Sequence, residues 1–273
     1  MGSKSSIRIA IAGATGRMGR ELLSALTATE LDLQLTAVST RPENNNLGRD
    51  IGVLLGGAEL GIELTTELQP QLFDVLIDFT LPEYSLRNCQ LCAQHGKAIV
   101  VGTTGFQANQ LEQIESYAAE IPILLAPNMS VGVNLLFYLL QEVTAVVGEQ
   151  ADVEIQETHH RNKLDAPSGT ALKMGEVIAE VLGRDLEKVA VHGRQGVGSI
   201  RNSETIGFSS IRAGDVIGDH TALFALAGER LEISHKASSR SIYAQGALRA
   251  ANWLATKNSG LYDMQDVLGL RKN

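Results

Sequence analysis

The densest group of reactive side chains in the sequence lies between residues 157 and 171. Two histidines and a lysine fall within five positions, at His159, His160 and Lys163. An imidazole titrates near neutral pH, and an ammonium group supplies a proton or a positive charge. We therefore expect this segment to exchange protons with a substrate and to attract its negative charge.

A helix is expected to begin directly after this group, over residues 168–182, with Ser168 as its N-cap. The first backbone N–H groups of a helix have no partner within the helix, and they point toward the positive end of its dipole. Gly169 and Thr170, with the hydroxyl group of Ser168 beside them, should therefore form an anion hole. Together with the basic side chains, this hole suits a substrate that carries carboxylates.

Three other interpretations of this segment compete with that one. A metal site is disfavoured because the adjacent residues His159 and His160 do not share a face, and no H-E-x-x-H motif is present. A nucleophilic Ser168 lacks the G-x-S-x-G elbow. A solvated basic loop stays open, since charged loops are common at surfaces.

A glycine-rich turn at residues 13–19 predicts a dinucleotide site. It reads G-x-x-G-x-x-G between an expected strand over 7–12 and an expected helix over 17–28. Bare backbone in such a turn lets a pyrophosphate approach the helix N-terminus, although a tight turn without a ligand is the simpler alternative. The residues expected to bind cofactor here are Gly13, Ala14, Thr15, Gly16, Arg17 and Met18.

The end of the second expected strand, over 33–38, should report which nicotinamide cofactor is used. An NAD site usually carries an acid there for the ribose 2′-hydroxyl, whereas this chain has Thr40 and Arg41. Arg41, helped by Arg17, can meet a 2′-phosphate, so NADPH is expected to serve at least as well as NADH. Alternatively, Arg41 is a solvated loop residue.

Two further loops follow expected strands over 98–101 and 121–126. Ligands of an open α/β sheet bind beyond the carboxyl ends of its strands, so both loops should line the nicotinamide end of the crevice. Plain turns are the alternative. The residues expected to contact cofactor are Gly102, Thr103, Thr104, Ala126, Pro127, Asn128 and Met129.

Strand and helix patterns alternate through residue 126 and then change. We predict a doubly wound, Rossmann-like parallel sheet, followed by a smaller α+β domain on a mainly antiparallel sheet. Turn signals at 214–215 and 227–228 favour antiparallel pairing of strands expected over 205–212, 221–225 and 229–235. The predicted domains are residues 1–130 with 241–273, which bind dinucleotide, and residues 131–240, which bind substrate and oligomerise.

Composition excludes several classes of protein. A formal net charge of −8 is unsuited to a phosphate backbone or an anionic membrane surface, and no apolar run reaches transmembrane length. A cytoplasmic location is the expectation.

The two cysteines, Cys89 and Cys92, form a C-x-x-C motif. This motif lies within a helical pattern over 83–95, so we expect the two thiols to pack in an apolar environment rather than to take part in redox or metal chemistry.

The sequence from 157 to 171, with its H-H-R-x-K-x-D-A-P-S-G-T-A string, resembles the 4-hydroxy-tetrahydrodipicolinate (dihydrodipicolinate) reductase family. The resemblance extends to residues 13–19, 79–80, 102–105, 128–134 and 235–240. It implies reduction of a cyclic unsaturated dicarboxylate by NADH or NADPH in the diaminopimelate and lysine pathway. It also implies a homotetramer assembled through the sheet of the smaller domain.

The resemblance assigns roles by motif: His159 as the acid/base residue, Lys163 as proton donor, and His160 with Gly169 and Thr170 as carboxylate ligands. One departure concerns Thr40, where family members often carry an acid. The absence of the acidic side chain at this position favours NADPH.

Two other functions compete with this one. The first is a reductase of another amino or keto acid, and the second is a nucleotide-sensing regulator, which would need no proton donors.

Overall fold

A computed structural model describes residues 6–271, and the chain divides into two compact units. The first unit comprises Met1–Ser130 and Ser241–Asn273, and the second comprises Val131–Arg240. Each unit has a hydrophobic core of its own.

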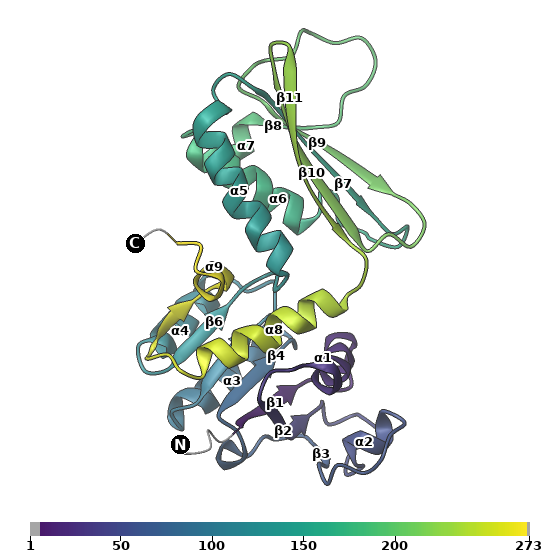
Figure 1. Ribbon diagram of the computed structural model, residues 1–273, viewed down its shortest axis with the longest axis vertical. Helices are drawn as coiled ribbons and strands as arrows, with labels where there is room; N and C mark the ends of the chain where they lie inside the picture. Colours follow the sequence, from purple (N-terminus) through teal and green to yellow (C-terminus); the bar gives the residue numbers. More distant parts are fainter. Residues whose placement is uncertain (1–5, 272–273) are drawn as a thin grey trace. The chain divides into compact units, whose positions relative to one another are not determined.

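The first unit is built on a seven-stranded sheet in the order β12-β6-β5-β4-β1-β2-β3, in which every pairing is parallel (Figure 1). Short apolar runs form its centre because both faces of the sheet are covered. The strands are β1 (Ile7–Ala12), β2 (Leu33–Ser39), β3 (Leu64–Thr65), β4 (Val75–Asp78), β5 (Ala98–Val101), β6 (Pro122–Leu125) and β12 (Gly260–Tyr262).

Successive residues of each strand point to opposite faces, and they enter two separate clusters. In β1, Ile9 and Ile11 join a core with α1 (Arg17–Ala28), α8 (Ser241–Leu254) and α9 (Met264–Leu268). Ala10 and Ala12 join a second core with α3 (Pro82–Gln94) and α4 (Ala108–Ala118). Helices therefore cover both faces, which confirms the predicted doubly wound fold.

Several short elements escaped the sequence-based prediction because they span too few residues to show a periodicity. The most consequential is β12, which follows α8 and pairs with β6, so the C-terminal segment contributes one of the two edge strands of this sheet. The others are α2 (Ile51–Leu54), β3, the 3-10 helix η1 (Pro70–Leu72), α7 (Leu186–Val189), β8 (Ala190–His192) and α9.

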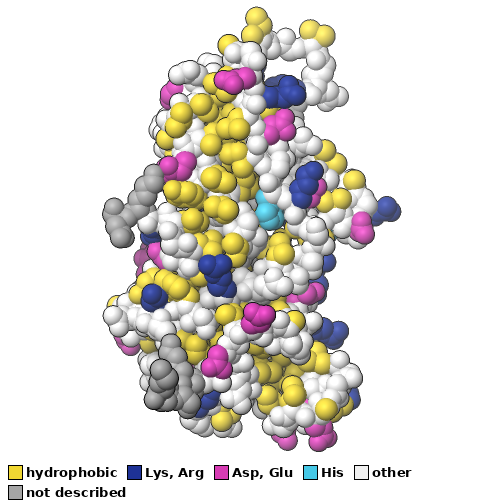
Figure 2. All heavy atoms as spheres, in the orientation of Figure 1, with side chains coloured by type: hydrophobic (Ala, Val, Ile, Leu, Met, Phe, Trp, Pro, Cys, Tyr) yellow, Lys and Arg dark blue, Asp and Glu magenta, His cyan; other side chains and the backbone are white. Residues whose placement is uncertain are grey.

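The second unit places two helices on one face of a five-stranded sheet (Figure 1). The strand order is β11-β10-β7-β9-β8, and the helices α5 (Val131–Val147) and α6 (Gly169–Val181) pack on it. The remaining strands are β7 (Asp152–His159), β9 (Ile206–Arg212), β10 (Gly218–Leu226) and β11 (Glu229–Ala237). Apolar residues also gather on the outer surface of α5 (Figure 2), where Leu135 and Val146 are exposed.

One predicted pairing in this sheet is wrong. β9 does not pair with β10, because β7 lies between them, antiparallel to β10 and parallel to β9. The turn residues after β9 specify only that the chain reverses, whereas neighbours are chosen by tertiary packing. The connection crosses the end of β7, where the Ala213 N–H donates to the His159 carbonyl oxygen at 2.9 Å. The sheet is therefore mixed, while the predicted fold class is confirmed.

Candidate active site

The glycine turn of the first unit leaves β1 in a conformation that excludes most side chains. Gly13 has φ +72°, a left-handed conformation that favours glycine. Gly19 is required for a different reason: a Cβ there would lie 2.3 Å from the Gly13 carbonyl oxygen and 2.6 Å from that of Ala14. The first glycine therefore makes the turn, and the last lets α1 pack against it.

The N-terminus of α1 is suited to an anion. Its N-cap, Gly16, offers no side-chain acceptor, and no acidic residue lies in the first turn. The N–H groups of that turn, including those of Arg17 and Met18, have no acceptor within the helix and attract negative charge. This arrangement fits the pyrophosphate of a dinucleotide, as the sequence predicts.

At the end of β2, Thr40 is buried, and its hydroxyl group lies 2.8 Å from that of Thr15 in the glycine turn. Asn44 donates to both hydroxyl oxygens, at 2.9 Å to Thr15 and 3.2 Å to Thr40. Arg41 is exposed beside this group. The structure thus brings Thr15, Thr40 and Arg41 together, and it adds Asn44, which the sequence did not single out.

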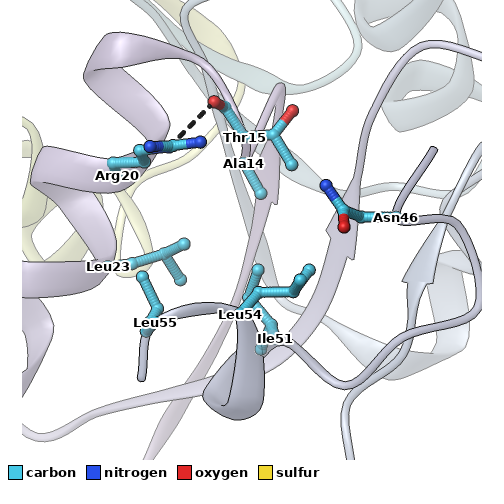
Figure 3. A pocket seen from close by; sticks show the side chains of 8 residues that line it. All are labelled: Ala14, Thr15, Arg20, Leu23, Asn46, Ile51, Leu54 and Leu55. Carbon is cyan, nitrogen blue, oxygen red and sulfur yellow. Dashed lines mark hydrogen bonds between the residues drawn. The ribbon is translucent and has the colours of Figure 1, made fainter. Parts of the chain in front are cut away.

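A cavity of about 260 Å³ adjoins the glycine turn (Figure 3). Arg20 donates to the Thr15 carbonyl oxygen at 3.2 Å. Leucine side chains of α1 and α2 line the cavity below these two residues in the view of Figure 3. Its lining residues are Ala14, Thr15, Arg20, Leu23, Asn46, Ile51, Leu54 and Leu55. None belongs to the loops after β5 and β6, so the cavity lies beside α1 rather than at the predicted nicotinamide position.

The loops after β5 and β6 lie at the same edge of the sheet, because these strands are parallel neighbours. Gly102 packs against an aromatic ring, since a Cβ there would lie 2.2 Å from Phe79 Cε1. The Thr103 hydroxyl accepts a hydrogen bond from Ser85 at 2.8 Å. The structure therefore fixes the start of the loop 102–105 against the residues that follow β4.

Asp78, a residue that sequence analysis did not single out, organises this edge. It ends β4, is fully buried, and accepts hydrogen bonds from the Thr80 N–H, the Thr80 hydroxyl and the Asn88 amide at 2.7–2.8 Å. Burial raises the pKa of its carboxyl group despite these bonds. An acid at the end of an apolar strand was the signal available in the sequence.

In the second unit, the alternation of β7 brings the reactive residues onto one face. Val153, Ile155, Glu157 and His159 are buried while their neighbours are less so. The buried face therefore changes from apolar to polar at the carboxyl end of the strand. There His159 Nδ1 lies 2.5 Å from Glu157 Oε2, and both side chains are almost inaccessible to solvent.

Arg212, at the end of β9, completes this group. It donates two parallel hydrogen bonds to Glu157, at 2.7 and 2.8 Å, and a third to the Asp165 carbonyl oxygen at 2.6 Å. Burial raises the pKa of Glu157, but the bonds from Arg212 and His159 outweigh it and lower that pKa to about 2. Glu157 is therefore anionic throughout the neutral range.

His220 of β10 stands directly opposite Glu157 in the antiparallel pairing. Its ring meets that of His159 edge-on, with centroids 5.1 Å apart, and its Nε2 lies 3.0 Å from the Ser168 hydroxyl oxygen. Burial, followed by the nearby His159, lowers the pKa of His220 to about 4. Sequence analysis missed His220 and Arg212 because only the sheet register brings them to the motif.

The predicted anion hole lies at the start of α6. The Ser168 hydroxyl accepts from the Ala171 N–H at 3.2 Å, which confirms the predicted N-cap, and the Ser168 N–H donates to Glu157 at 3.3 Å. Both polar groups of Ser168 therefore have partners within the protein. A Cβ on Gly169 would meet no atom within 4 Å, so the helix start is open beside it. Thr170 follows within the first turn.

The loop between β7 and α6 carries the remaining predicted residues. The Lys163 N–H donates to the His160 carbonyl oxygen at 3.1 Å, so the two residues form one turn. Lys163 Nζ lies 2.9 Å from Asp165 Oδ2, and this bond lowers the pKa of Asp165. His159, His160 and Lys163 are thus neighbours in space, next to the start of α6.

The two cysteines lie on α3 as free, buried thiols. Burial raises the pKa of Cys89 to about 12, and it raises that of Cys92 as well. Between residues 6 and 271, no group of three or more His, Cys, Asp or Glu side chains is arranged to hold a metal. Within the same range, no helix combines the length and apolarity needed to cross a bilayer.

Comparisons with known proteins cover nearly the whole chain. A family model described as dihydrodipicolinate reductase, N-terminus, matches residues 7–129, and one described as dihydrodipicolinate reductase, C-terminus, matches residues 132–268. A solved structure of dipicolinate-bound dihydrodipicolinate reductase from Paenisporosarcina sp. TG-14 shares 27% identity. The match between the two structures covers 95% of this chain and 98% of that chain, with a TM-score of 0.72.

More distant structures share the fold alone. An amine dehydrogenase from Mycobacterium smegmatis is 12% identical over 98% of both chains, with a TM-score of 0.63. GenD2 from gentamicin A biosynthesis, solved in complex with NAD, is 15% identical over 99% of this chain and 93% of that one, with a TM-score of 0.56. Such likenesses do not identify a substrate.

Proposed function

Because this chain belongs to the dihydrodipicolinate reductase family, we propose roles for its residues in the reaction of that family. The membership confirms the resemblance found in the sequence. The chain is an NAD(P)H-dependent oxidoreductase that reduces 4-hydroxy-tetrahydrodipicolinate to tetrahydrodipicolinate in the diaminopimelate and lysine pathway. Substrate, NAD(P)H and a proton give product, NAD(P)⁺ and water.

His159 is the acid/base residue in this proposal, and Lys163 is the proton donor. Bound NAD(P)H supplies the hydride. Loss of the 4-hydroxyl group of the substrate as water leaves a conjugated C=C–C=N system. Hydride arriving at that system leaves negative charge that must be protonated, and a positioned imidazolium or ammonium lowers that barrier. The observation that carries the assignment is the buried His159–Glu157 pair beside the open start of α6. A merely solvated basic loop would not hold a histidine in this way.

Substrate carboxylates bind to His160 and to the backbone at Gly169 and Thr170 in this proposal. Support comes from the open space beside Gly169 and from the positive end of the α6 dipole. Ser168 belongs to the same predicted substrate set. Its side chain and N–H already have protein partners, so we assign it the role of fixing the helix start that receives the carboxylate.

The first unit is the dinucleotide-binding domain, and the second is the substrate-binding and oligomerisation domain. The glycine turn receives the pyrophosphate, and Gly102 to Thr104 with Ala126 to Met129 line the nicotinamide. NADPH serves at least as well as NADH, because Arg41 is exposed beside Thr40 and no acid stands at that position. Steady-state kinetics with both cofactors test this, and a strong preference for NADH would contradict it.

We also infer a homotetramer formed through the five-stranded sheet. The helices α5 and α6 pack on one face of this sheet, while side chains such as Ile211 and Leu231 remain exposed on its strands. Size-exclusion chromatography with light scattering measures the assembly directly, and a monomer would contradict the inference.

A cytoplasmic location is part of the same proposal. The two free, buried thiols accord with a reducing compartment of this kind.

The activity is tested by following NADPH oxidation with the condensation product of pyruvate and aspartate semialdehyde as substrate. A panel of other amino and keto acids serves as the control for specificity. His159→Gln should reduce turnover by about a hundredfold or more and leave cofactor affinity intact. Unchanged turnover would remove His159 from the mechanism.

A further inference from the structure

We propose that Glu157 and Arg212 are positioning residues that hold His159 with its proton on Nδ1, so that Nε2, reached across the bare backbone of Gly218, is the nitrogen that exchanges a proton with substrate. This inference rests on the proposed role of His159. It adds the chemical form of the imidazole and the atom that reacts.

The surroundings of Glu157 keep its carboxyl group ionised. The side chain of this residue is 1% exposed, and both of its oxygens accept from the guanidinium of Arg212 in a paired geometry. A buried carboxylate with two charge-assisted hydrogen bonds stays ionised. Arg212 in turn is held by the Asp165 carbonyl oxygen at 2.6 Å, so the carboxylate has a fixed position.

The bond to Glu157 determines which ring nitrogen of His159 carries the proton. An ionised carboxylate only accepts hydrogen bonds, so at 2.5 Å from Oε2 the ring atom Nδ1 must carry the proton. A neutral imidazole then has its lone pair on Nε2, and an imidazolium can release only the Nε2 proton without breaking the bond to Glu157. A carboxylate orients a catalytic histidine in the same way in the triads of hydrolases.

His159 Nε2 lies beside a residue that has no side chain. Gly218, the first residue of β10, lies on the same face of the sheet as His220, beside the ring of His159. A Cβ at Gly218 would lie 3.0 Å from His159 Nε2, closer than to any other atom. A side chain at this position would therefore crowd Nε2, while Glu157 occupies Nδ1.

Charged and titratable groups face His159 from each neighbouring element. Glu157 lies on its own strand, Arg212 on β9, His220 on β10 with His235 of β11 opposite it, and Lys163 on the following loop. Burial lowers the pKa of His159, whereas the bond and the charge of Glu157 raise it. Glu157 thus opposes the desolvation that would leave His159 neutral and unable to donate.

The form of the ring is tested on the unmodified enzyme. Protein labelled with ¹⁵N-histidine reports the protonation of each ring nitrogen by NMR, and the signals of His159 are those lost in His159→Gln. We expect a protonated Nδ1 and an unprotonated Nε2 above the pKa of His159. A proton on Nε2 instead would overturn the inference without reference to any variant of Glu157.

The kinetic test uses Glu157→Gln, which keeps the shape but removes the charge. We expect kcat to fall about 10- to 100-fold with less than a threefold change in substrate KM, and the limb of the pH profile due to His159 to move to lower pH. The matched control is Glu154→Gln, on the same strand. The carboxylate of Glu154 is likewise paired with arginine, in this case with Arg194 and Arg201. It should change neither kcat nor the profile.

Gly218→Ala tests the access of Nε2 by adding one methyl group. We expect at least a tenfold fall in kcat with unchanged binding of NADPH, whereas Gly198→Ala, where an added Cβ meets no atom, should be neutral. Normal kcat in both Glu157→Gln and Gly218→Ala, with an impaired His159→Gln, would refute this inference alone. Normal turnover in His159→Gln would refute the proposed function itself.

Discussion

Replacing Glu157 by glutamine should destabilise the protein in a manner that depends on pH. The carboxylate is buried, paired with Arg212 through two hydrogen bonds, and bonded to His159. Glutamine has the same shape but no charge, so the variant removes the ionic contribution and leaves the guanidinium of Arg212 without its counter-ion. Loss of one partner of a buried pair is costly for this reason.

The size of the effect follows from the pKa of Glu157, which falls from 4.5 to about 2 on folding. Each pKa unit corresponds to about 1.36 kcal/mol, so ionised Glu157 stabilises the folded state by about 3 kcal/mol at neutral pH. Since the folded pKa is the lower one, this stabilisation is fully present above about pH 4.5. It declines as the pH falls toward 2, and about 2 kcal/mol remains at pH 3.5.

Urea unfolding at pH 7 and pH 3.5, at one protein concentration, measures the difference between the parent chain and Glu157→Gln. The difference in unfolding free energy should fall from about 3 to about 2 kcal/mol. The control is Glu176→Gln, which breaks an exposed pair with Lys173 and should cost less than about 1 kcal/mol. A loss below about 1 kcal/mol in Glu157→Gln, or one that does not change with pH, would refute the reasoning.

Three other outcomes are expected. Gly19→Ala should cost about 1–3 kcal/mol of stability and weaken NADPH binding, because the added Cβ would overlap the glycine turn. Calorimetry and fluorescence titration measure these two effects. The control, Gly57→Ala, should be neutral in both measurements, because the nearest atom to its Cβ would lie at 3.6 Å. Arg41→Ala should raise the KM for NADPH by about tenfold and leave that for NADH nearly unchanged in steady-state assays; equal effects would contradict a 2′-phosphate contact. Neither Cys89 nor Cys92 should react with a thiol reagent until the protein is denatured, because burial raises both pKa values, and rapid colour development in the native enzyme would argue otherwise.

Local sequence was sufficient for features that depend on neighbouring residues. The strand Ile7–Ala12, the helix Arg17–Ala28 and the Ser168 cap were all predicted from apolar periodicity and capping chemistry. The glycine turn was readable because its residues are contiguous. The family, and with it the reaction, followed from the string at 157–171, which is specific without any knowledge of the fold.

Tertiary structure alone decided which distant residues surround that string. Glu157 is part of the motif, but the sequence assigned it no role, because its partner Arg212 lies 55 residues further along the chain. The two side chains meet only because β7 lies between β9 and β10 in the sheet. His220 reaches Glu157 through the antiparallel register of β10. Strand neighbours are selected by the packing of whole faces, a non-local balance that periodicity and turn residues do not encode, and so the partners that set the charge of the site came from the fold.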